Sequence, residues 1–133
     1  ITSLPKSTYE ALLKGIEDTG QNSGMTLILA LNYSSKWELT KAMQKLGQKI
    51  AEGALNASEI TEISIANELD TKDYPDPDLL IRTSGEQRLS NFLLWRSVGA
   101  VFWSTPVLWP DFQREHLVQA IDFYRAQVVR RGD

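Results

Sequence analysis

The chain is organised around the stretch PDLLIRTSGEQRLSNFLLW, which spans residues 77–95. Within it, the apolar run Leu79–Ile81 is bounded by prolines on one side and by Gly85 on the other, a pattern typical of a buried strand in a parallel sheet. Ser90 precedes the apolar segment 92–95 and is a favourable helix N-cap. The stretch therefore predicts a strand, a loop and a helix, in that order.

Two arginines accompany the loop between this strand and this helix. Ligands of open α/β sheets bind beyond the carboxyl ends of the strands, where a helix N-terminus offers unpaired N–H groups. A guanidinium holds phosphate oxygens in a planar fork. Arg82, Arg88 and Ser90 therefore predict a site for a phosphate-bearing ligand. From their spacing alone, ion pairs of the arginines with Glu86 or Asp78 are an equally good interpretation.

Three elements are expected before this stretch. A capping box at Ser7 begins an amphipathic helix that Gly20 ends, and the nearly unbroken apolar run 25–33 predicts a buried strand. Ser35 caps a second helix, which ends at Gly53. Its polar side carries a lysine stripe, formed by Lys41, Lys45 and Lys49. We interpret this stripe as a solvated face rather than a nucleic-acid site, because no aromatic side chains are interleaved with it.

A short helical segment with Asn56 or Thr61 as its cap, and then a connector rich in proline and aspartate, lead into the stretch. Beyond it, we expect the helix to end near Ser97, a short strand over Ala100–Trp103, and a last helix capped by Asp111. The apolar residues of that last helix repeat at helical spacing: Leu117, Ile121, Tyr124 and Val128. These elements predict one α/β domain over residues 1–133, with about three parallel strands and helices on both faces.

Composition narrows the classes of function. The 133 residues carry a net charge of −3, so a basic site must be local and no nucleic-acid partner is expected. The absence of cysteine excludes disulfides and thiolate metal sites, and the single histidine, His116, is interpreted as a helix-surface residue. No apolar run approaches the length of a membrane-spanning helix, and a cytoplasmic location is the expectation.

Residues 78–95, followed by Leu-Trp-Pro-Asp-Phe at 108–112, resemble the C-terminal signature of the cis-prenyltransferases, the undecaprenyl diphosphate synthase family. The resemblance covers nearly the whole chain but only the C-terminal half of the family pattern, and it implies that half of the family's fold. It implies that Arg82, Arg88 and Ser90 hold the diphosphate of isopentenyl diphosphate. The implied reaction condenses this substrate onto an allylic diphosphate such as farnesyl diphosphate. The protein is then expected to contact a membrane only through its lipid product.

The resemblance also implies a magnesium ion held by two carboxylates. One belongs to an N-terminal Met-Asp-Gly-Asn-like block that this sequence does not contain, and the position of the other is occupied by Val101. We therefore assign no catalytic and no metal-binding residue, and expect the chain alone to be inactive. Glu86 is interpreted as a residue that orients Arg82 or Arg88; contact with a metal bound by another subunit is the alternative.

The leading hypothesis is thus a polyprenyl diphosphate synthase fragment. The alternatives are a non-catalytic partner subunit of a cis-prenyltransferase complex and an unrelated module that binds diphosphate or another anion. The apolar segment 97–109 and the tail Arg130-Arg131-Gly132 predict a homodimer or association with a related chain, and an intrachain core is the competing interpretation of the same segment.

Overall fold

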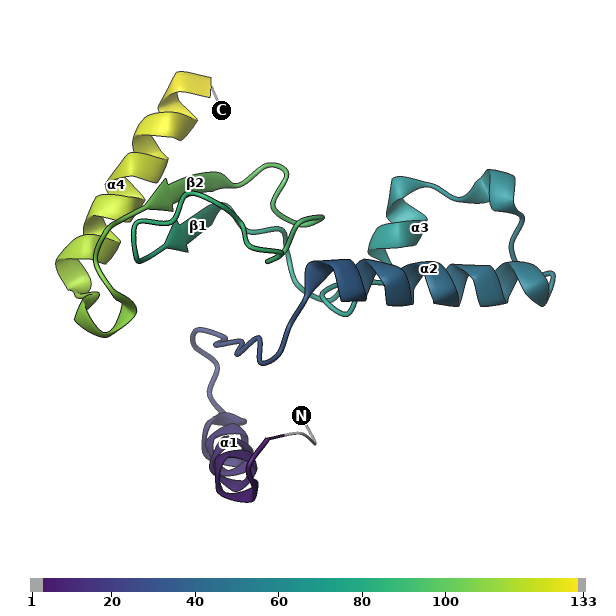
Figure 1. Cartoon of the computed structure of the whole chain (residues 1–133), viewed down its shortest axis with the longest axis horizontal. Coiled ribbons are helices and arrows are strands. Elements are labelled where there is room, and N and C mark those ends of the chain that lie inside the picture. Colours follow the sequence, from purple (N-terminus) through teal and green to yellow (C-terminus); the bar gives the residue numbers. More distant parts are fainter. Residues whose placement is uncertain (1–3, 132–133) are drawn as a thin grey trace. The chain divides into compact units, whose positions relative to one another are not determined.

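The computed structural model describes residues 4–131. In chain order the elements are α1 (Lys6–Thr19), α2 (Ser35–Ala51), η1 (Ala57–Glu59), α3 (Glu62–Ala66), β1 (Leu79–Arg82), β2 (Val101–Ser104), η2 (Trp109–Asp111) and α4 (Arg114–Arg131) (Figure 1). The chain divides into two units, Ile1–Tyr33 and Ser34–Asp133. The predicted α/β class, with a small parallel sheet and helices, is confirmed.

The first unit holds α1 and a segment without regular secondary structure. The helix begins after Pro5, which makes no side-chain cap, so the predicted capping box at Ser7 is not formed; Gly20 follows the last helical residue, as expected. The segment 25–30 belongs to no helix or strand of the described residues, and Met25 is 91% exposed. The predicted buried strand over 25–33 is therefore not observed, because no neighbouring strand supplies its hydrogen bonds.

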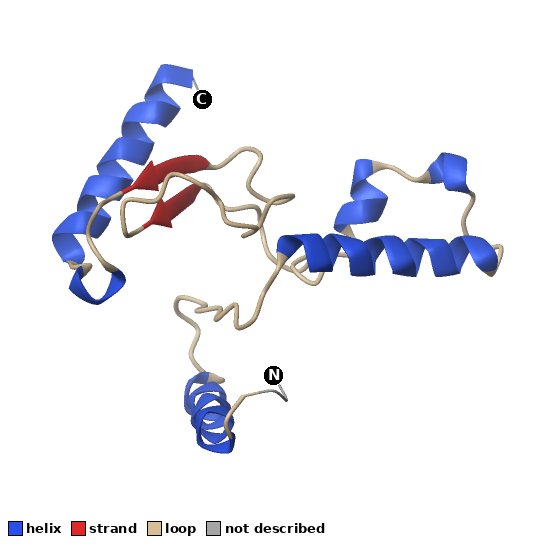
Figure 2. Cartoon of the chain, in the orientation of Figure 1, coloured by secondary structure: helices blue, strands red, loops and turns tan. Residues whose placement is uncertain are grey.

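The second unit is built on a two-stranded parallel sheet within the described residues (Figure 2). Leu79 pairs with Val101 and Arg82 with Ser104, so both strands of this sheet lie where the sequence predicts them. The backbone N–H of Thr105 donates to the carbonyl of Arg82 at 2.9 Å and extends the pairing beyond the strand ends. Helix α4 packs against both strands.

The crossover between β1 and β2 does not contain the predicted helix from Ser90 to Ser97. Ser90, Asn91 and Leu93 have φ values of 46°, 64° and 47°, which a right-handed helix cannot contain. The segment is instead a series of turns, and Ser90 is not a helix N-cap. Tertiary hydrogen bonds, described below, override the helical preference of the sequence here.

Helix α2 begins at Ser35, the residue predicted to be its cap, so the observed cap lies one residue earlier. Ser34 is the N-cap, and its Oγ accepts a hydrogen bond from the backbone N–H of Trp37. The helix ends at Ala51, close to Gly53, whose φ of 72° stops it. Further along, the side chain of Thr61 caps α3, and Asn56 is the N-cap residue of η1, where its backbone N–H donates to the Glu59 carboxylate.

The lysine stripe of α2 is not a freely solvated face, because it binds the connector that precedes β1. Lys41 Nζ lies 3.2 Å from the Asp70 carboxylate, Lys45 Nζ donates to the Glu68 carbonyl at 3.0 Å, and Lys49 pairs with the Glu68 carboxylate. Four-residue spacing places the three lysines on one helix face. The stripe thus ties α2 to the segment that leads into the sheet.

The last helix also starts differently from the prediction. Asp111 ends η2 rather than capping α4, and the backbone N–H of Gln113 donates to Nδ1 of His116 at 2.8 Å. His116 lies on the helix surface, as predicted, with its ring centroid 5.5 Å from that of Phe112. Leu117 is exposed rather than inward-facing. No helix of the described part is long and apolar enough to cross a membrane, and the tail residues Gly132 and Asp133 lie outside it.

Candidate functional site

The loop after β1 is held in place by backbone hydrogen bonds. The N–H of Ser84 donates to the Val107 carbonyl at 2.9 Å, and the N–H of Gly85 donates to the Thr105 carbonyl at 2.8 Å. Ser84 and Gly85 have φ values of 67° and 72°, a turn that glycine adopts without strain. The start of the loop is therefore fixed against the segment that follows β2.

Three of the four predicted site residues are brought together in this loop. Nε of Arg88 lies 3.3 Å from Oγ of Ser90 and 2.9 Å from Oε2 of Glu86. The Arg88 side chain is 71% exposed, and a guanidinium carries five N–H donors, more than these two contacts occupy. Arg88 can therefore donate outward to a ligand while Ser90 and Glu86 hold its inner edge.

Arg82, the fourth predicted residue, ends β1 and is half-buried. Strand alternation places it on the same sheet face as Leu80, whose register partner is Phe102. A cavity of about 170 Å³ opens on that face, and its lining includes Leu80, Phe102 and Arg88. Among the described residues Arg82 makes no ion pair. The two arginines thus border one face of the sheet.

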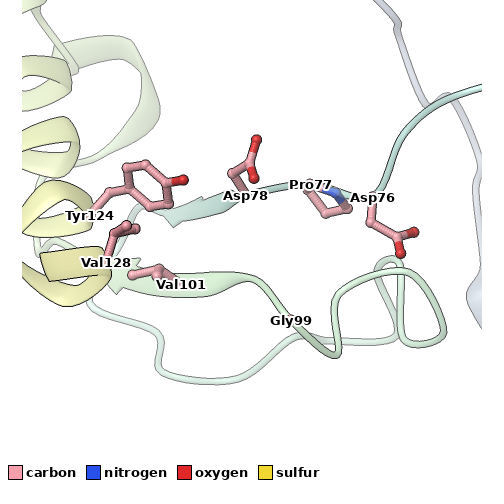
Figure 3. Close-up of a pocket in the computed structure, with 7 residues that line it drawn as sticks. All are labelled: Asp76, Pro77, Asp78, Gly99, Val101, Tyr124 and Val128. Atoms are coloured by element: carbon pink, nitrogen blue, oxygen red, sulfur yellow. The ribbon is translucent and has the colours of Figure 1, made fainter. Parts of the chain in front are cut away.

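A second cavity, of about 280 Å³, lies where the connector, β2 and α4 meet (Figure 3). Its lining residues are Asp76, Pro77, Asp78, Gly99, Val101, Tyr124 and Val128. Val101 is buried and presents only methyl groups where the resembled family has a metal-binding glutamate. The described residues contain no group of three or more histidine, cysteine, aspartate or glutamate side chains that could hold a metal ion. Val101 therefore supplies no ligand for a magnesium ion in this cavity.

Arg96 fixes the connector beside this second cavity. Its Nε lies 2.8 Å from the Asp76 carboxylate, and its guanidinium also donates to the carbonyl of Tyr74. The Arg96 side chain is largely buried, so these contacts satisfy a charge removed from water. Sequence reasoning missed this residue, because a lone arginine after an apolar segment gives no sign of its partner.

Asn91 is a second residue that the sequence interpretation missed. It follows Ser90 directly and contacts the start of α2 through its side chain and its carbonyl. The available signal was its residue type, since asparagine tolerates positive φ and caps helices well. Its target, a helix more than fifty residues earlier in the chain, was not visible in the sequence.

Comparisons with known proteins agree with this fold. The family model described as undecaprenyl diphosphate synthase matches residues 1–132. An isoprenyl transferase of Halalkalibacterium halodurans is 46% identical over 132 residues, covering 99% of this chain and 52% of that protein. The isoprenyl transferase of Bacillus subtilis is 45% identical over 131 residues, covering 98% and 50%. The chain thus spans about half the length of the curated relatives it matches.

A solved structure is similar as well. Lavandulyl diphosphate synthase from Lavandula x intermedia, in complex with dimethylallyl diphosphate, superposes with a TM-score of 0.83 and is 36% identical. The match covers 93% of this chain and 53% of that one. On the strength of the family model and these relatives, the chain belongs to the undecaprenyl diphosphate synthase family of prenyltransferases.

Proposed function

We propose that this chain supplies the isopentenyl diphosphate site of a cis-prenyltransferase. Arg82, Arg88 and Ser90 hold the diphosphate, and the substrate is condensed onto an allylic diphosphate such as farnesyl diphosphate. The observation that carries the proposal is the contact of Arg88 with Ser90 in the loop beyond the carboxyl end of β1. That is the edge at which open α/β sheets bind their ligands.

The chemistry of the loop supports a diphosphate rather than a neutral ligand. A diphosphate carries several negative charges, and two guanidinium groups on one sheet face supply the matching positive charge. Glu86 orients Arg88 through its 2.9 Å contact. The cavity beside Arg88 is lined by Leu80, Leu89 and Phe102 among others, so the hydrocarbon part of the substrate has an apolar surface next to its diphosphate.

We propose further that the chain alone does not carry out prenyl transfer. Magnesium supports the family's reaction by offsetting charge on the departing diphosphate, and Val101 offers it no ligand. The missing carboxylates then belong to another polypeptide segment, with which this chain acts in the cytoplasm. Contact with a membrane occurs only through the lipid product.

A role as a partner subunit is the second candidate, and an exposed apolar surface favours it. Val98, Leu108 and Trp109, the first residue of η2, are all exposed, and Trp109 is 73% exposed. Exposed tryptophan is typical of protein interfaces. We propose that this segment associates with a second copy or with a related chain.

Isothermal titration of isopentenyl diphosphate, and separately of pyrophosphate, tests the diphosphate site. We expect Arg88→Ala to weaken binding of both ligands by about tenfold or more, since a charge-assisted hydrogen bond contributes about 1.5–3 kcal/mol. Arg125→Ala is the matched control, because Arg125 is equally exposed and also ion-paired, but lies on α4. Equal affinities of the wild type and Arg88→Ala would refute the assignment.

A further inference from the structure

Asn91 completes the first turn of α2. Its carbonyl accepts a hydrogen bond from the N–H of Ser35 at 2.9 Å, its Oδ1 accepts from the N–H of Lys36 at 2.9 Å, and its Nδ2 donates to Oγ of Ser34 at 2.8 Å. That Oγ accepts in turn from the N–H of Trp37. Three consecutive N–H groups that a helix start leaves without intrahelical partners are thus satisfied, two of them directly by Asn91.

A further hydrogen bond joins the crossover to α2, with its donor on the crossover and its acceptor on the helix. The hydroxyl of Ser35, which is fully buried, accepts a hydrogen bond from the backbone N–H of Leu94 at 3.0 Å. The crossover segment between these bonds has positive φ at Ser90, Asn91 and Leu93. Non-glycine residues persist in this conformation where the surrounding structure holds them. The hydrogen bonds to α2 join this segment to an element outside the crossover and help to hold it in this conformation.

The docked segment is continuous with residues 83–90, the loop after β1 that we propose binds the diphosphate (the anion-binding loop). Ser90 immediately precedes Asn91, and the Oγ of Ser90 is the atom that accepts from Nε of Arg88. A shift of the Asn91 backbone therefore moves the Ser90 hydroxyl and removes one of the two contacts that hold the inner edge of Arg88. Supporting hydrogen bonds of this kind keep binding groups in their productive geometry.

We infer that Asn91 is a positioning residue for diphosphate binding: by docking on the N-terminus of α2, it fixes Ser90 and, through Ser90, the guanidinium of Arg88. This inference rests on the proposed function of the loop. The affinity for diphosphate then depends on the first turn of α2, a helix more than fifty residues earlier in the chain. Because coupling between two sites is reciprocal, a bound diphosphate in turn stabilises that first turn.

The first experiment titrates inorganic pyrophosphate into the 133-residue chain and its variants. Asn91→Gly keeps the positive φ and the backbone carbonyl but removes the side chain, and Asn91→Asp keeps an acceptor for the N–H of Lys36 and can accept from the Ser34 hydroxyl. We expect about tenfold weaker binding for Asn91→Gly, the lower end of the loss seen when residues that support metal ligands are removed. We expect near wild-type binding for Asn91→Asp, whose charge faces a helix N-terminus.

Thr61→Ala is the matched control, because Thr61 caps α3 with its side chain and lies outside the loop. We expect it to leave the pyrophosphate affinity unchanged. Equal weakening in Thr61→Ala and Asn91→Gly would reduce the effect to general stability and overturn the inference, as would wild-type affinity in Asn91→Gly.

The second experiment needs no variant at position 91. Amide hydrogen exchange of Ser35, Lys36 and Leu94 is measured with and without pyrophosphate. We expect pyrophosphate to slow the exchange of these amides in the wild type and to leave it unchanged in Arg88→Ala. If the wild type binds pyrophosphate without any change at these amides, the inference fails while the proposed function stands. If the wild type does not bind pyrophosphate, both fail.

Discussion

The carboxylate of Glu38 accepts hydrogen bonds from both the backbone N–H and the hydroxyl of Thr71, at 2.9 and 2.8 Å. Glu38 lies in the first turn of α2 and is 1% exposed. Thr71 belongs to the connector that leads to β1. A buried carboxylate is costly unless it is hydrogen-bonded, so this pair stabilises one particular placement of the connector against α2.

Removing the Glu38 side chain is expected to destabilise the second unit. Glu38→Ala leaves the N–H and hydroxyl of Thr71 without their acceptor, and the expected loss is about 2 kcal/mol in the free energy of unfolding. Glu38→Gln should lose less, because both bonds go to one oxygen, Oε1, which glutamine retains. Urea unfolding measures the loss. Glu10→Ala, an exposed glutamate of α1, is the control, and an equal loss there would contradict the prediction.

The pair of Glu68 with Lys49 predicts a dependence of stability on pH. The hydrogen bond from Lys49 lowers the pKa of Glu68 below its ordinary value of 4.5, and the charges of nearby lysines lower this pKa further, while burial opposes them. Because the folded pKa lies below the unfolded one, the stabilisation is fully present above the unfolded pKa. It is lost as the pH falls through the folded pKa.

The urea midpoint, measured from neutral pH down through the carboxylate range, tests this prediction. Lys49→Met removes the largest cause of the lowered pKa of Glu68, so the acid-side loss of stability should become smaller. Lys14→Met, in α1, removes a lysine of the other unit and should leave the profile as in the wild type. An unchanged profile in Lys49→Met would show that the pair does not contribute.

Restoring the family's glutamate should not restore activity. Val101 is 6% exposed and shares its cavity with Asp76 and Asp78, so Val101→Glu places a carboxylate at a buried position beside two others. We expect a loss of about 3 kcal/mol in unfolding free energy, the scale for a buried charge without a partner. Thermal unfolding gives the loss, and Val129→Glu, at a position 79% exposed, makes the same change on the surface.

The same samples test catalysis. Neither the wild type nor Val101→Glu is expected to incorporate radiolabelled isopentenyl diphosphate into a polyprenyl product in the presence of magnesium. Product formed by the purified wild-type chain would refute the proposal that the missing carboxylates belong to another segment.

Association through the segment 97–109 is expected at tens of micromolar. Trp109 stacks on Phe112 with their ring centroids 5.9 Å apart, yet remains largely exposed. Light scattering should therefore report a dimer or a larger species, and Trp109→Ser should shift it toward the monomer. Trp37→Ser changes an exposed tryptophan of α2 and is the control. A wild type that stays monomeric would exclude this surface as an interface.

Local sequence pattern was sufficient to predict an element that depends only on its own residues and on one neighbouring element. The apolar run Leu79–Ile81, which follows two prolines, predicts β1. The repeat of apolar residues at helical spacing predicts α2 to within a residue of its start. It failed for residues 25–33, because an apolar run forms a strand only where another strand pairs with it. It also failed at Ser90, where bonds to α2 replaced the expected helix with turns.

The candidate site shows the same division. The proximity of Arg88, Ser90 and Glu86 followed from their spacing in one short loop. Asn91 was missed because its partners, Ser34 and Lys36, lie more than fifty residues away. Asp111 was misassigned because the actual contact at the start of α4 comes from His116, a residue inside the helix whose ring reaches back to Gln113.

The docking of Asn91 on α2 has a consequence for the order of folding. Helices α2 and α3 can form from contiguous sequence, whereas the first turn of α2 waits for a residue 55 positions further along the chain. Closing so long a loop costs entropy that grows with the logarithm of its length. We therefore expect a nascent chain to acquire its helices early, with a frayed start to α2, and to order the anion-binding loop only when the crossover has been synthesised and has closed.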